Sequence, residues 1–233
     1  MADRIFQVPN VIEFHRVPPY PLKNCMDMIS LTAGVLSVRY SKLPDRLTHT
    51  IGIIVEDTYI PFLEAVEGSA EDPWPPSPPM QQMVQESFTP DASPVLLGVG
   101  LSGNGHWSSA IETKESRGLK FDIACKNSKN ATELGSRYRV LGTIQPSPRP
   151  NSVEIVLAAI NVSANNEITR IEFAVTIGRL DSIDAKGDIK VSPMSDAKLS
   201  QTHRWCYEVS LLVLGSALSI VMAAYASSFS SGG

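Results

Sequence analysis

Residues 119–126 alternate apolar and polar side chains along the chain, in the order Leu-Lys-Phe-Asp-Ile-Ala-Cys-Lys. Leu119, Phe121, Ile123 and Cys125 would share one face, and the charged side chains would share the other. A period of two with one polar face is typical of a half-exposed strand in an antiparallel sheet. This segment therefore predicts a fold built on at least one sheet with a solvent-facing side.

Many other short segments resemble strands, because Val, Ile, Phe and Tyr recur between polar or proline-containing links. The link Ser102–Gly105 contains Asn-Gly, which is a strong hairpin signal. Helix signals are fewer, and capping residues and glycine stops predict short helices at Asn24–Gly34 and Tyr59–Glu67. We therefore predict a mainly β protein, either an antiparallel β-sandwich or an open barrel. The other candidate strands are residues 5–17, 34–40, 49–55, 95–101, 106–112, 136–144, 152–162 and 168–177.

The C-terminal part of the chain carries a long uncharged stretch. No residue from Val209 to Tyr225 is charged, and a membrane-spanning helix needs roughly 17–25 mostly apolar residues. We predict a single transmembrane helix over residues 205–227, followed by a short tail at residues 228–233. A buried core helix is the alternative interpretation, because Gly215 and several serines lower the hydropathy of the stretch.

Small residues recur every four positions within this predicted helix, at Gly215, Ser219 and Ala223. Such spacing places them on one helix face, where they allow a second helix to approach closely. The expected partners are therefore the membrane, and other membrane-protein subunits or a second copy of this chain packed against the helix.

The remaining chain divides into a β-rich domain, residues 1–180, and a polar linker, residues 181–204. Lys198 and Arg204 precede the predicted helix and nothing basic follows it, so the large N-terminal domain is expected to face the cytoplasm. A proline-rich loop, residues 68–94, interrupts the domain. This loop is predicted to be either a stiff exposed connector or a polyproline segment that docks into an aromatic groove on a partner.

Charge and cysteine content argue against a nucleic-acid-binding domain and against a disulfide-rich domain. The net charge is −4 and no dense lysine–arginine cluster occurs, whereas nucleic-acid-binding domains carry a basic patch or stripe. The three cysteines are far apart and odd in number, which does not suggest a disulfide framework. We predict no nucleic-acid partner.

One local motif resembles a cofactor signature, because Gly98, Gly100 and Gly103 match G-x-G-x-x-G. A dinucleotide site also needs a helix that opens at the third glycine, and a strand-like segment follows here instead. The glycines are better explained by a twisted hairpin or a bulge. His106 and Trp107 follow after Asn104-Gly105, and they are interpreted as a strand-edge residue and a packing residue. No cofactor, metal ligand or catalytic residue is predicted.

Two hypotheses of function follow from these patterns. The first is a non-catalytic, membrane-anchored β-domain that acts as an interaction or structural subunit of a membrane protein assembly. The second is an enzyme or small-ligand-binding sandwich or barrel, with a site near the Gly98–Trp107 hairpin that includes His106 and Trp107. The sequence favours the first, because no catalytic constellation is recognisable.

Overall fold

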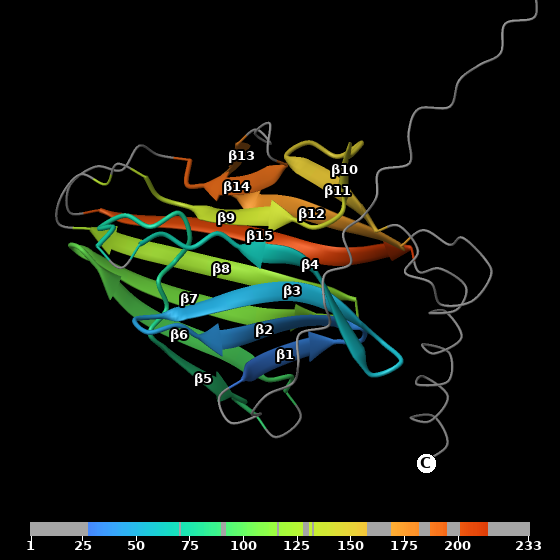
Figure 1. Ribbon diagram of the computed structural model, residues 1–233, viewed down its shortest axis with the longest axis horizontal. Coiled ribbons are helices and arrows are strands. Elements are labelled where there is room, and N and C mark those ends of the chain that lie inside the picture. The colour runs from blue at the N-terminus through green and yellow to red at the C-terminus, as the bar shows by residue number, and fades with distance from the viewer. Residues whose placement is uncertain are drawn as a thin grey trace, which may run out of the picture.

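The protein folds into two antiparallel β-sheets that pack face to face (Figure 1). The computed structural model describes residues 28–69, 71–89, 92–115, 117–127, 131, 133–157, 169–181, 187–194 and 201–213. In strand order, the seven-stranded sheet contains β1 (Ile29–Ala33), β2 (Leu36–Lys42), β3 (Leu47–Val55), β4 (Thr58–Ala65), β9 (Ser136–Val140), β14 (Asp188–Ser192) and β13 (Arg179–Asp181). The eight-stranded sheet contains β10 (Thr143–Pro146), β11 (Ser152–Leu157), β12 (Thr169–Ile177), β15 (Thr202–Val213), β8 (Gly118–Asn127), β7 (Gly105–Lys114), β6 (Val95–Ser102) and β5 (Gln82–Glu86).

The prediction of a mainly β, antiparallel protein is confirmed, and the arrangement is a sandwich. The described ranges contain no helix, so none of their segments is a helix that could cross a membrane. The hairpin predicted at Ser102–Gly105 joins β6 and β7. The two strands pair continuously, from Ser102 opposite Gly105 to Val95 opposite Glu112. The turn between β3 and β4 places Glu56 and Asp57 at positive φ, which is the backbone shape of a two-residue hairpin turn.

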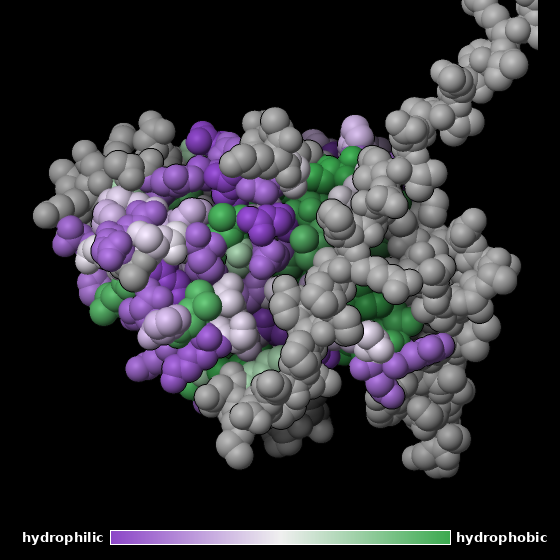
Figure 2. All heavy atoms as spheres, in the orientation of Figure 1, coloured by the Kyte–Doolittle hydropathy of each residue, from purple (hydrophilic) through white to green (hydrophobic). Residues whose placement is uncertain are grey.

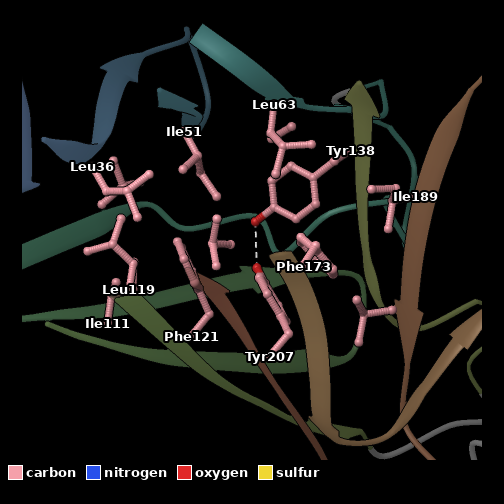
Figure 3. Packing of buried hydrophobic residues seen from close by; sticks show 14 of the residues in the cluster. Leu36, Ile51, Leu63, Ile111, Leu119, Phe121, Tyr138, Phe173, Ile189 and Tyr207 are labelled. Atoms are coloured by element: carbon pink, nitrogen blue, oxygen red, sulfur yellow. Dashed lines mark hydrogen bonds between the residues drawn. The ribbon is translucent and has the colours of Figure 1, made fainter. Parts of the chain in front are cut away.

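The core lies between the inner faces of the two sheets (Figure 3). Leu36, Ile51 and Leu63 approach from the seven-stranded sheet, and Phe121 and Phe173 approach from the eight-stranded sheet. All of these side chains are at most 1% exposed. Polar side chains cover most of the coloured surface in Figure 2, with apolar residues in smaller patches between them. The inner faces therefore supply most of the buried apolar area that stabilises the fold.

The predicted start of the transmembrane helix at residue 205 is wrong, because residues 205–213 belong to strand β15. Trp205, Tyr207, Val209 and Leu211 are buried, and apart from the buried Cys206 the residues between them are more exposed, which is the period of a strand and not of a helix. β15 pairs with β8 and β12 on its two sides, so it is a central strand of its sheet. The rest of the predicted helix, residues 214–227, lies outside the described residues.

Three other segments differ from their sequence-based predictions. The stretch predicted as a polar linker, residues 181–204, contains β14, which pairs with β9 and buries Ile189 and Val191. The segment predicted as the helix Tyr59–Glu67 contains β4, where Pro61 opposes Gly52 at a register shift, a position that tolerates proline. The described end of Asn24–Gly34 is strand β1. In the two segments predicted as helices, sheet pairing outweighs a weak local helix preference.

Candidate functional site

A buried proline-rich segment bridges the two sheets, and we call residues 71–81 the proline strap. Trp74, Pro75, Ser77, Pro78, Pro79 and Met80 are all buried. The Leu47 amide of β3 donates to the Met80 carbonyl at 2.6 Å, and the Ser77 hydroxyl donates to the Arg137 carbonyl of β9 at 2.9 Å. The Gln81 amide donates to the Val99 carbonyl of β6 at 2.9 Å. The strap is therefore neither an exposed connector nor a free polyproline ligand, and β5 follows it within the predicted loop.

The G-x-G-x-x-G glycines make room for this strap. A Cβ added at Gly100 would overlap the Pro79 carbonyl oxygen, and one at Gly103 would lie 2.7 Å from Pro73 Cβ. A Cβ at Gly98 would meet Met80 Sδ at 3.1 Å. The three glycines thus allow the backbone of the strap to lie close against β6 and its turn. This agrees in part with their interpretation as residues of a twisted hairpin.

A pocket of about 290 Å³ opens where the strap crosses the β6–β7 turn. Its volume is close to the lower end of the range for small-ligand pockets. Three distant parts of the sequence form it: the β2–β3 loop, the strap, and the end of β6 with its turn. The lining residues are Asp45, Arg46, Glu71, Asp72, Pro73, Pro79, Gln81, Leu101, Ser102 and Gly103.

Arg46 is the buried polar residue of this pocket and is 5% exposed. Its Nε and Nη2 donate to Asp45 Oδ2 at 2.9 and 2.6 Å, and Nη2 also donates to the Ser69 carbonyl at 3.0 Å. The hydrogen bonds from Arg46 lower the pKa of Asp45. Arg46 Nη1 is buried with no hydrogen-bond acceptor. The internal contacts of the pocket therefore leave one donor unsatisfied.

A second unsatisfied group belongs to Glu67, whose Oε2 is buried without a partner. Burial raises the pKa of Glu67 to about 7, while a hydrogen bond from Thr48 and the charge of Arg46 act in the opposite direction. The folded state therefore binds the Glu67 proton more tightly than the unfolded chain does. Its contribution to stability is present below the unfolded value of 4.5 and is lost as pH rises through 7.

Glu67→Gln should therefore raise the free energy of unfolding above pH 7, by up to about 3 kcal/mol. Glutamine resembles the protonated carboxyl and does not titrate. The difference from the wild type should shrink as pH falls and vanish below 4.5. Urea unfolding across this pH range measures it, with the exposed Glu86→Gln as the control. A stability difference that does not depend on pH would contradict the assignment.

The buried core also contains a polar network, formed by His49, Tyr138 and Tyr207. His49 Nε2 and the Tyr138 hydroxyl are 2.7 Å apart, and the Tyr138 hydroxyl is hydrogen-bonded to that of Tyr207 (Figure 3). Burial lowers the pKa of His49 to about 3 and raises that of Tyr138 well above its usual value. These groups are neutral near pH 7 and are bonded to one another, so they stabilise the core and are poorly placed for proton transfer to a substrate.

The predicted ligand residues His106 and Trp107 point to opposite faces of β7. His106 is exposed on the outer face, whereas Trp107 is 2% exposed and packs edge-on against Trp205 with 5.9 Å between ring centroids. Neither residue lines the pocket, although the turn that precedes them does. Gly215, Ser219 and Ala223 lie outside the described residues.

The outer face of the eight-stranded sheet has an apolar edge, which we call the outer apolar row: Val84 on β5, and Leu97, Val99 and Leu101 on β6. Val84, Val99 and Leu101 are 51%, 53% and 54% exposed. Val84 and Leu97 are direct cross-strand neighbours. An outward face of an antiparallel sheet is normally polar, so this row is an exception.

The neighbouring outer surface of the same sheet carries paired charges. Lys120 of β8 lies 3.3 Å from Glu112 of β7, and Lys114 lies 2.7 Å from Glu208 of β15. Arg204 and Asp122 form a further pair across β15 and β8. The apolar row therefore borders a surface built in the usual polar manner.

Comparisons with known proteins do not assign the chain to a family. No family model matches it, and no curated protein matches it. Two solved structures of heparinase III, the BT4657 gene product, are similar to it, one of them with methylated lysines. Their TM-scores are 0.45 and 0.44, with 8% and 10% sequence identity over 82% of this chain. The match spans 37% of those longer chains.

Proposed function

We propose that this chain is a non-catalytic β-sandwich that binds a protein partner, as an interaction or structural subunit of a membrane protein assembly. The outer apolar row carries the proposal. Val99 and Leu101 expose about half of their surface side by side on β6, and a contiguous apolar patch on an otherwise polar surface is typical of a protein interface.

The chemistry of the reactive side chains supports a non-catalytic role. His49 is neutral near pH 7, because burial lowers its pKa to about 3. Burial also raises the pKa of the Cys125 thiol to about 12, and the thiol form is a poor nucleophile. Both side chains face the core, where they contribute packing and hydrogen bonds.

Val99→Lys should abolish partner binding, because it places a charge at the centre of the row. The measurement is copurification from native membranes in mild detergent, with Met194→Lys as the control at another exposed apolar position. A stoichiometric partner should remain with the wild type and the control and be lost from Val99→Lys. The same partner recovered in equal amount with all three proteins would contradict the role of the row.

Membrane attachment is the second part of the proposal. Because β15 continues to Val213, an anchoring helix would begin beyond that residue. The apolar residues 214–225 alone fall short of the roughly 17–25 needed to span a bilayer, so the helix would also use the neutral residues 226–233.

The full chain should therefore remain in the membrane pellet after an alkaline carbonate wash. A chain that ends at Val213 should be released by the same wash, and it serves as the matched control. Release of both forms would exclude an integral anchor, and retention of both would assign membrane attachment to the sandwich itself.

A small-ligand site at the β6–β7 hairpin is the second candidate function. It is favoured by the pocket of about 290 Å³ beside that hairpin and by the unsatisfied Nη1 of Arg46. A substitution in the outer apolar row distinguishes the two candidate functions. A small-molecule site would tolerate Val99→Lys, which lies outside the pocket, whereas a protein-binding surface would not.

A further inference from the structure

The outer apolar row and the pocket are continuous, because Leu101 belongs to both. Its side chain is 54% exposed at the end of the row and also lines the pocket. Gln81 lines the pocket as well, and its side-chain amide exchanges hydrogen bonds with the Leu101 backbone at 3.2 and 3.3 Å. A partner that covers the row would therefore reach the mouth of the pocket.

The pocket carries excess negative charge. Asp45 is paired with Arg46, which leaves Glu71 and Asp72 uncompensated among the lining residues. Asp72 Oδ1 accepts the Trp74 amide at 3.0 Å, and within the described ranges neither Asp72 Oδ2 nor the Glu71 carboxylate has a partner. Two carboxylates at the end of an apolar row favour an occupant with a positive charge.

The walls of the pocket favour a cation on an alkyl stem. Pro73, Pro79 and Leu101 supply apolar surface between the carboxylates, and lysine and arginine side chains bury their methylene groups against such surface. Arg46 lines the same pocket, but its charge is paired with Asp45 at 2.6 Å. The carboxylates of Glu71 and Asp72 are therefore the charges that an occupant of the pocket meets.

We infer that this pocket receives a lysine or arginine side chain from a partner polypeptide whose neighbouring apolar residues cover the outer apolar row. The basic side chain places its charge between Glu71 and Asp72 and its stem along Pro73 and Leu101. This inference rests on the proposed function, because it names the chemistry of the protein that the row binds.

Selection from a library of random displayed peptides on the full chain tests the inference. Selected peptides should share apolar residues next to a lysine or arginine. Glu71→Gln and Asp72→Asn should each weaken these peptides by about tenfold, the effect of losing one charge-assisted hydrogen bond. Glu56→Gln removes the same charge at the distant β3–β4 turn and should leave binding unchanged.

The outcomes distinguish the inference from the proposed function. Apolar peptides without an enriched basic residue, whose binding needs Val99 but not Asp72, would overturn the inference and leave the protein-binding role. Peptides that bind Val99→Lys as well as the wild type, or no enrichment at all, would overturn both. Equal weakening by Glu56→Gln and Asp72→Asn would show general charge attraction and would also overturn the pocket assignment.

Two other occupants of the row would contradict the inference in their own ways. A second copy of this chain would give a dimer in analytical ultracentrifugation that Val99→Lys dissociates. If the chain's own residues 1–27 covered the row, peptides would bind only after those residues were removed. A monomeric full chain that binds basic apolar peptides directly is the result we expect.

Discussion

Replacing Gly100 with alanine should lower the free energy of unfolding by about 3 kcal/mol, at the upper end of the usual cost of overpacking a well-packed interior. The new Cβ would overlap the Pro79 carbonyl oxygen and lie 2.9 Å from the Pro79 carbonyl carbon and 3.1 Å from Met80 Cα. These are backbone atoms, so a rotamer change cannot relieve the contact and the strap itself must move. Equilibrium unfolding in urea measures the loss.

Gly98→Ala provides a matched comparison on the same strand. There the added Cβ would meet the hydroxyl of Ser109, which is a side chain. A second change, Ser109→Ala, should therefore restore much of the stability of Gly98→Ala and none of that of Gly100→Ala. Equal rescue of both variants would show that the strap does not lie against Gly100 as described.

Regular alternation made most of the sheet predictable from the sequence. In β7 and β8 most inward residues are apolar or small and most outward residues are polar, so Trp107 and Phe121 mark the buried face without further information. The β6–β7 hairpin was also predictable, because the Ser102–Gly105 link carries turn residues at the positions that the backbone needs. The β3–β4 hairpin was missed, because the segment after its turn was predicted as the helix Tyr59–Glu67 and is strand β4.

Strand β15 was not predictable in the same way. Its inner residues Val209 and Leu211 are buried, and its outer residues near the end, Ser210 and Leu212, carry no charge. Alternation is invisible when both faces lack charge, and a short apolar run does not distinguish a central strand from a helix. The segment is a strand because it pairs with β8 and β12. These partners lie elsewhere in the sequence, so the segment alone does not reveal the pairing.

The pocket could not be predicted for a related reason. Arg46, Asp72 and Leu101 are far apart in the sequence, and only the path of the proline strap brings them together. No spacing rule covers such a cluster. The one local signal was the run Gly98, Gly100 and Gly103, which indicates close backbone approach without naming the segment that approaches.

Truncation of Trp107 to alanine should cost about 3–5 kcal/mol, the usual loss for a buried large aromatic side chain. Trp107 is 2% exposed and contacts Trp205 edge-on across the sheet, so alanine would leave a cavity that the rigid strands cannot close. His106→Ala, at the exposed neighbouring position, should change stability by less than about 0.5 kcal/mol.

Trp107→Phe separates packing from any role of the indole nitrogen. Trp107 Nε1 is buried without a hydrogen-bond acceptor, so phenylalanine removes an unsatisfied donor while it keeps most of the aromatic contact. Its free energy of unfolding should lie much closer to that of the wild type than to that of Trp107→Ala, and peptide binding by the outer apolar row should be unchanged. A large loss of binding with unaltered stability in Trp107→Phe or His106→Ala would instead favour a ligand site at these two residues, because packing alone would affect stability first.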